Sequence, residues 1–274
     1  MVEALLLLPV VFGALLVLLS LPFQEVTRAR VAKLARRQSL PITVANGPIV
    51  IGYLATTRRW RGVGVLLSIV GGLVYARLTL SSSNGGAAAL FVGWFVGAVI
   101  AEWRVSVHTA GTGRRRASLL PRRLSDYLPG HVRLAVLIAF ALLSTVEFVG
   151  LFSKPAQPEL AGWIALTLAT AAVIVAVGRH ILGRPQPLAA DDILAADEAI
   201  RSRSLHVLAG ATLAITGYLG AAVLSLRLDD LGVLAPWAGA IATLLPLLGL
   251  MLACATSQLP ARLARSESRE LLER

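Results

Sequence analysis

Four acidic residues form the stretch of this sequence that most resembles a catalytic motif. Asp191, Asp192, Asp197 and Glu198 follow the pattern Asp-Asp-x4-Asp-Glu. Paired carboxylates of this kind hold Mg²⁺ and a bound diphosphate in prenyl-transferring enzymes, because that ion prefers oxygen ligands. Two observations count against a metal site: a second aspartate-rich motif is missing, and helical residues five apart diverge by about 140°. The alternative is a solvated helix start in which Asp197 pairs with Arg201 one turn later.

Other residue types that carry chemistry are sparse. His131, His180 and His206 fall at the ends of apolar runs, and His108 lies in a central polar segment. Haem would need two histidines facing each other inside a bundle, so we interpret all four as interfacial and expect no cofactor. Cys254 is the single cysteine, which excludes an intramolecular disulfide.

A polar, arginine-dense segment (residues 102–133) separates two long apolar runs. Its basic cluster consists of Arg114, Arg115, Arg116, Arg122 and Arg123. Four apolar residues follow at helical spacing: Leu120, Leu124, Tyr127 and Leu128. This pattern predicts a short amphipathic helix at the membrane surface, with arginines that bind anionic lipid headgroups or a protein partner. The alternative is that these charges only set the topology.

Composition indicates the elements that position these residues. The 274-residue chain is 56% hydrophobic, and this share exceeds the roughly half that is usual in soluble domains. Its mean hydropathy is +0.74. Its net charge of +11 lies in short loops beside apolar runs. That distribution is typical of membrane topology and not of a basic nucleic-acid groove.

Seven apolar runs are long enough, or nearly so, to cross a bilayer, which takes about 20 residues. They cover residues 4–21, 62–80, 87–101, 132–152, 160–181, 206–226 and 231–256. We therefore predict an all-α, seven-span membrane protein with a single integral domain over residues 1–274, built as a lead helix followed by three hairpins. The amphipathic stretch 46–61 either lies in the membrane plane or extends the second span.

Charge asymmetry between the loops predicts the orientation. The loops on one side hold 23 lysines and arginines, and those on the other side hold three. Basic loops stay in the cytoplasm, so we expect a multi-pass plasma-membrane protein with its N-terminus outside and its C-terminus inside.

Small residues repeat every four positions on the second and third spans. The two stripes are Gly64, Ser68, Gly72, Ala76 and Ala89, Gly93, Gly97, Ala101. In lipid such stripes let helix backbones approach closely. The two spans should form a tight antiparallel pair.

Glu147 is the one carboxylate well inside a predicted span. A charge in the membrane is costly enough to need a partner. Arg77 lies at nearly the same predicted depth, so we predict an intramembrane ion pair between them; the alternative is that each reaches the outer headgroups separately.

Two stretches, NGPIVIGYLATTRRWR (46–61) and RRRASLLPRRLSDYLP (114–129), resemble those of uncharacterised seven-span membrane proteins of high-GC actinobacteria. That family has no assigned activity, so the resemblance implies a fold and no functional residues.

From the sequence we favour a non-enzymatic, transport-associated or permease-like subunit whose basic cytoplasmic face meets a partner or anionic lipid. The alternative is a membrane-embedded enzyme acting on a lipid or isoprenoid diphosphate.

The loop asymmetry predicts that the connection around Ser83 is outside the cell. A cysteine introduced there should react with a membrane-impermeant maleimide in whole cells, and one introduced at Ser118 should react only after permeabilisation. The reverse labelling pattern would overturn the predicted orientation.

Overall fold

The computed structural model describes residues 23–79, 85–109, 115–116, 122–153, 158–187 and 190–228. These residues are mainly helical, as the sequence predicts. The longer helices are α2 (Arg28–Arg37), α3 (Gly47–Thr79), α4 (Gly85–Thr109), α5 (Gly130–Ser153), α6 (Pro158–Gly183) and α7 (Asp191–Leu228). Two-residue strands β1 (Arg115–Arg116) and β2 (Gln186–Pro187) pair antiparallel. The predicted spans 4–21 and 231–256 lie outside the described residues.

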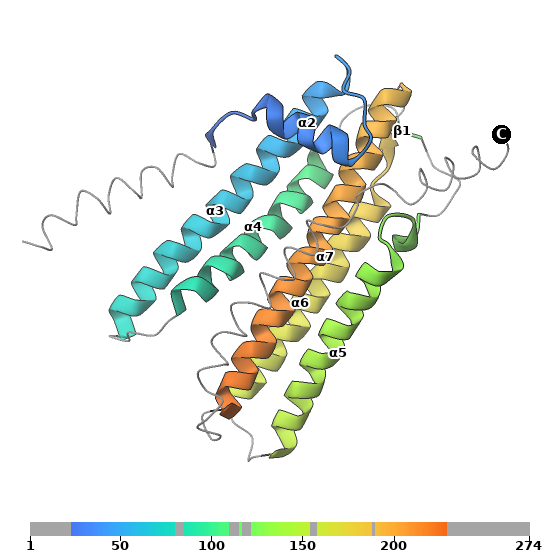
Figure 1. The fold of residues 1–274 in the computed structure, drawn as a ribbon. Coiled ribbons are helices and arrows are strands. Elements are labelled where there is room, and N and C mark those ends of the chain that lie inside the picture. The colour runs from blue at the N-terminus through green and yellow to red at the C-terminus, as the bar shows by residue number, and fades with distance from the viewer. Residues whose placement is uncertain are drawn as a thin grey trace, which may run out of the picture.

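Helix α7 lies at the centre of the described helices. It contacts α3, α4, α5 and α6, and Figure 1 shows it between the α3–α4 pair and α5. Helix α2 crosses one end of α3 and α7, and β1 lies at that same end (Figure 1). We call this the basic end: it comprises α2, the β1–β2 pair and the first halves of α3 and α7.

Three of these helices have the length and composition of membrane spans. They are Gly130–Leu151, Leu160–Gly183 and Asp191–Leu224. Their faces differ: the α5 and α6 windows are mostly exposed, whereas most of the α7 window is buried inside the protein. Apolar side chains that cover the outside of a bundle are typical of a membrane protein, where lipid replaces water.

Helices α3 and α7 are longer than the predicted second and sixth spans. Helix α3 has 33 residues and α7 has 38, which correspond to about 50 and 57 Å at a rise of 1.5 Å per residue. The stretch 46–61 is therefore continuous, from Gly47 on, with the helix that contains the predicted second span. Because about 20 residues suffice to cross a bilayer, both helices have surplus turns, and these turns form the basic end.

The predicted amphipathic helix in the central segment is wrong for the residues that the structure describes. A single 3-10 turn, η2 (Leu124–Asp126), forms there. Tyr127 and Leu128 are 0% and 5% exposed, whereas Leu124 is 39% exposed. Tyr127 and Leu128 pack in an apolar cluster with Val132 and Val177, so tertiary packing replaces the expected lipid-facing surface. Leu120 lies outside the described residues.

The glycine stripes do bring α3 and α4 into close contact. A Cβ atom added to Gly64 would lie 2.8 Å from the Gly97 Cα atom, and one added to Gly97 would lie 2.9 Å from the Arg61 Cα atom. Real Cβ atoms essentially never approach so closely. The predicted tight antiparallel pair is confirmed at these positions.

We predict that Gly97→Ala destabilises the protein, because its new methyl group meets backbone atoms of α3 that cannot move aside cheaply. Overpacking of this kind costs about 1–3 kcal/mol. Gly71→Ala is the matched control: nothing lies within 4 Å of its added Cβ, and alanine favours the helix. Thermal unfolding in detergent should show a lower midpoint for the first variant and an unchanged or higher one for the second. Equal midpoints would contradict close packing at Gly97.

Candidate functional site

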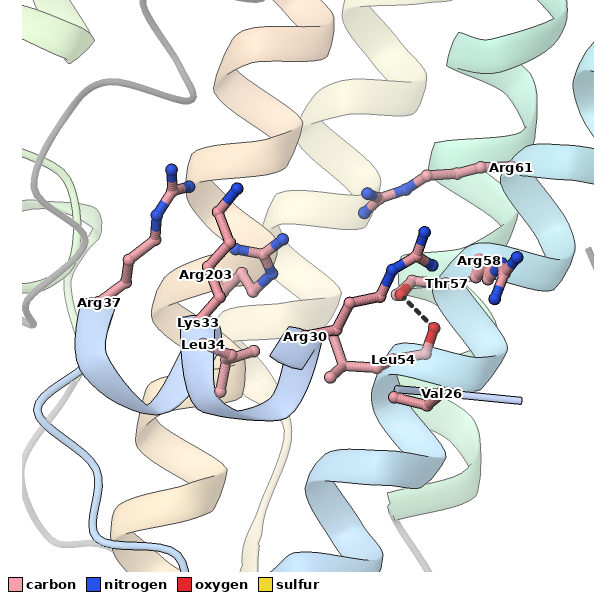
Figure 2. A pocket seen from close by; sticks show the side chains of 10 residues that line it. All are labelled: Val26, Arg30, Lys33, Leu34, Arg37, Leu54, Thr57, Arg58, Arg61 and Arg203. Carbon is pink, nitrogen blue, oxygen red and sulfur yellow. Dashed lines mark hydrogen bonds between the residues drawn. The ribbon is translucent and has the colours of Figure 1, made fainter. Parts of the chain in front are cut away.

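A cavity of about 460 Å³ opens at the basic end between α2, α3 and α7. Six of its ten lining residues are basic: Arg30, Lys33, Arg37, Arg58, Arg61 and Arg203. The other four are Val26, Leu34, Leu54 and Thr57, so none of the described residues that line the cavity is acidic. Figure 2 shows the heads of the α2 cations on one side of that helix, with Arg61 extending toward them from α3.

Apolar contacts hold α2 in place over the cavity. Leu34 is 2% exposed and packs in a cluster that includes Tyr53 of α3 and Ile200 of α7. The helix ends in a Schellman motif: the Leu40 N–H donates to the Ala35 carbonyl at 2.9 Å, and Ser39 has a positive φ. Leu40 then joins the same cluster, which fixes where α2 stops.

The connection from α2 to α3 is tied to the start of α7. The Asn46 side chain, completely buried, accepts a hydrogen bond from the Thr43 N–H at 2.9 Å and donates to the carbonyls of Pro41 and Asp192. The Thr43 hydroxyl donates to the Asp192 carboxylate. Buried polar groups need such partners, and here they set the position of α2 relative to α7.

Arg58 forms part of the α3 wall, and no described carboxylate pairs with it. Its guanidinium donates to the backbone carbonyls of Gln24 and Glu25, each at 3.2 Å, and to the Gln24 side chain at 2.6 Å. Burial, followed by the nearby charge of Arg30, lowers the pKa of Arg58. The second cause is the ordinary effect of a like charge, which disfavours the protonated form.

Arg61 is held by a buried carboxylate behind the cavity wall. Its Nη2 atom lies 3.0 Å from Oε1 of Glu102, which is 1% exposed. Glu102 also accepts hydrogen bonds from the hydroxyls of Tyr53, at 3.5 Å, and Ser204. Burial, and then the charge of Glu102, raises the pKa of Tyr53 to about 12. This network connects α3, α4 and α7.

The predicted acidic cluster is divided among separate partners. Asp197 binds Arg184 and Arg201, so the predicted Asp197–Arg201 pair is confirmed. That pair is buried, with an Arg201 side chain 0% exposed, whereas the sequence predicted a solvated helix start. Glu198 accepts a hydrogen bond from the Tyr127 hydroxyl at 2.7 Å and lies 3.3 Å from Arg122.

Asp191 is exposed at the start of α7, while Asp192 binds Thr43 as described above. Among the described residues, no group of three or more histidine, cysteine or acidic side chains could hold a metal ion. Three of the four acidic residues thus act as intramolecular partners.

The predicted arginine cluster is also divided. The Arg122 side chain is 7% exposed and turned toward Glu198, and it donates to the Arg184 carbonyl at 2.9 Å. Arg123 is exposed. Arg115 and Arg116 form β1, but their side chains, together with the whole of Arg114, lie outside the described part of the structure. Arg122 is therefore a structural residue, and lipid or partner binding by the others stays a prediction.

Glu147 has a partner inside the bundle. It is 6% exposed and accepts a hydrogen bond from the Thr167 hydroxyl of α6 at 2.6 Å. The side chain of Arg77 lies outside the described residues, and α3 and α5 stand apart in Figure 1. The Glu147–Arg77 pair stays a prediction, which a double-mutant cycle would test.

The histidines do not gather at one site. His180 stacks on Trp103 with ring centroids 4.4 Å apart, and His131 is exposed. His206 is 1% exposed, and its Nδ1 atom lies 2.9 Å from the Ser202 carbonyl. The side chain of His108 lies outside the described residues.

Sequence reasoning missed the cavity because it used the α2 cations only to assign topology. A local signal exists: Arg30, Lys33 and Arg37 recur at the spacing of one helix face. Glu102 was missed too, although it is a lone carboxylate at the end of an apolar run. Its pairing with Arg61, 41 residues away, depends on tertiary packing.

No protein-family model, curated protein or solved structure matches this chain. The site is therefore interpreted from its own geometry.

We predict that Glu102→Gln destabilises the protein, because Arg61 loses its buried counter-charge. Breaking a buried pair on one side costs on the order of 3 kcal/mol. Asp191→Asn removes the same charge from an exposed position and should change stability by less than about 0.5 kcal/mol. Thermal unfolding in detergent provides the comparison, and equal effects would argue against the Glu102 network.

Proposed function

We propose that this protein is a seven-span plasma-membrane protein whose basic end faces the cytoplasm and binds anionic lipid headgroups. The observation that carries this proposal is the cavity between α2, α3 and α7, where six of the described lining residues are basic and none is acidic. In this function the protein is a non-enzymatic, transport-associated or permease-like component whose basic cytoplasmic face meets lipid.

The level of the cavity along the helices supports a headgroup ligand. Arg61 directly precedes the apolar run that begins at residue 62, and Arg58 lies one helical turn earlier. Arg203 lies three residues before the run that begins at 206. Both helices continue without a break through these points. The cavity is therefore at the depth where two independent apolar runs begin, which is the depth of lipid phosphates.

Aromatic residues support the same depth. The guanidinium carbon of Arg104 lies over the ring of Trp60, 5.0 Å from the ring centroid. The half-exposed Trp103 stacks on His180. Tryptophan is enriched where hydrocarbon meets headgroups, because its ring is apolar and its N–H is polar. Trp60 directly precedes the cavity residue Arg61 in α3.

The opposing proposal, an enzyme acting on a lipid or isoprenoid diphosphate, depends on carboxylates that are free to hold a metal. Asp197 and Glu198 are instead bound by arginines and a tyrosine, and Asp192 binds Thr43. None of them lines the cavity. The geometry therefore favours binding over metal-assisted transfer.

Helix α2 offers a matched test. Arg30 and Arg37 line the cavity, whereas Arg28 and Arg36 are exposed on the same helix and do not. Arg30→Gln/Arg37→Gln should weaken phosphatidylglycerol binding, measured by native mass spectrometry of the full chain, by roughly 30-fold if each arginine contributes about 1 kcal/mol.

The control Arg28→Gln/Arg36→Gln removes equal charge from the same helix and should change binding far less. An equal loss of lipid binding in both variants would show that binding depends on general surface charge and not on the cavity. No loss in either variant would refute the cavity as a headgroup site.

A further inference from the structure

The excess of positive charge in the cavity goes beyond what a singly charged headgroup can offset. Resting on the proposed headgroup function, we propose that the ligand is a lipid with a terminal phosphomonoester, which carries close to two negative charges, in preference to a phosphodiester lipid, which carries one. The inference depends on the partners of the six cations, their directions and the apolar part of the lining.

Four of the six cations have no carboxylate partner among the described residues. Arg30, Lys33 and Arg37 are exposed, and no ion pair or hydrogen bond to another described residue involves their side chains. Arg58 donates to neutral carbonyl groups alone. The charge of Arg61, by contrast, is already offset by Glu102. A lipid with one negative charge would leave most of the repulsion between these cations in place. A phosphomonoester offsets about twice as much of their positive charge.

The cations approach the cavity from three elements. Helix α2 supplies Arg30, Lys33 and Arg37, α3 supplies Arg58 and Arg61, and α7 supplies Arg203, as Figure 2 shows. A phosphomonoester has three terminal oxygens, each able to accept charge-assisted hydrogen bonds from guanidinium or ammonium donors. A phosphodiester has two such oxygens, and its second ester bond would occupy one of the three directions.

The apolar lining favours a lipid over a soluble phosphate. Val26, Leu34 and Leu54 contribute apolar surface beside the cations. The volume of about 460 Å³ lies within the range of about 300–1,000 Å³ typical of sites for whole small molecules. A phosphate, a glycerol unit and the start of an acyl chain therefore fit the lining better than phosphate alone.

The charge of the ligand makes binding depend on pH. The second ionisation of a phosphomonoester has a pKa of about 6. The titratable and charged groups that line or adjoin the cavity are Glu25 before α2, Arg30, Lys33 and Arg37 of α2, Tyr53, Arg58 and Arg61 of α3, Glu102 of α4 and Arg203 of α7. Among the described residues, no histidine, the side chain that ordinarily changes charge between pH 5 and 8, lines the cavity. His206, three residues after Arg203 on α7, is 1% exposed. Preference for a phosphomonoester should therefore weaken as the pH falls through 6, because the ligand gains a proton.

The full chain in detergent can be titrated with dioleoyl phosphatidic acid and dioleoyl phosphatidylglycerol by native mass spectrometry. We expect phosphatidic acid to bind at least tenfold more tightly at pH 7.5 and the ratio to fall by several-fold at pH 5.5. Lys33→Gln should lower the pH 7.5 ratio, whereas its matched control Arg36→Gln should leave it unchanged. Glycerol 3-phosphate and inorganic phosphate should compete poorly with phosphatidic acid.

Each contrary result has its own meaning. Equal affinity for the two lipids, or a ratio independent of pH, would overturn the phosphomonoester inference while leaving headgroup binding intact. Effective competition by glycerol 3-phosphate would overturn the lipid assignment in favour of a soluble phosphate. Failure of both lipids to bind would refute the proposed function itself, which separates the two proposals.

Discussion

The charged half of α7 is the constraint on which the basic end depends. Arg201, 0% exposed, donates to the carbonyls of Ile181, Leu182 and Arg184 and to the carboxylate of Asp197. These carbonyls belong to the end of α6 and the turn after it, where a helix leaves acceptors without partners. One buried arginine thus satisfies the end of α6 and neutralises an acid. Burying charge is costly, and this geometry offsets the cost with several hydrogen bonds at once.

The same half of α7 binds each of the connections packed around it. Asp192 bonds to the loop before α3, Glu198 to the segment before α5, and Ser204 to Glu102 of α4. Losing one partner would strand a buried polar group, which costs more than the hydrogen bond itself contributes. The polar residues of α7 therefore specify which elements meet, while the apolar cluster around Leu34 supplies much of the attraction.

This framework explains how like charges can gather at the cavity. Arg30, Lys33 and Arg37 of α2 line the same cavity as Arg58 of α3. Leu34 and the Asn46 loop hold α2 on α3 and α7. These surrounding contacts therefore keep the cations of two helices close together.

The apolar half of the bundle is held together differently. Close backbone contact at Gly64 and Gly97 brings α3 against α4, the kind of packing that small residues allow between apolar helices. Few polar side chains are involved, and those that are find local partners. Thr212 and Thr216 donate to carbonyls of α7 itself, and Glu147 takes its hydrogen bond from Thr167.

Features that depend on local periodicity or composition could be predicted from the sequence alone. The apolar character of the helices, the tight α3–α4 pair and the Asp197–Arg201 pair all involve spacings of three or four residues, which helical geometry converts directly into contacts. The burial of Tyr127 and Leu128, the pairing of Arg61 with Glu102 and the cavity itself were decided by tertiary structure. Each joins residues from different elements, and amphipathic patterns do not state whether an apolar face meets lipid or another helix. The same holds for the charged residues, because the sequence does not state which elements meet. Every cation of the cavity could be read from the sequence, but only the docking of α2 across α3 and α7 brings them to one place.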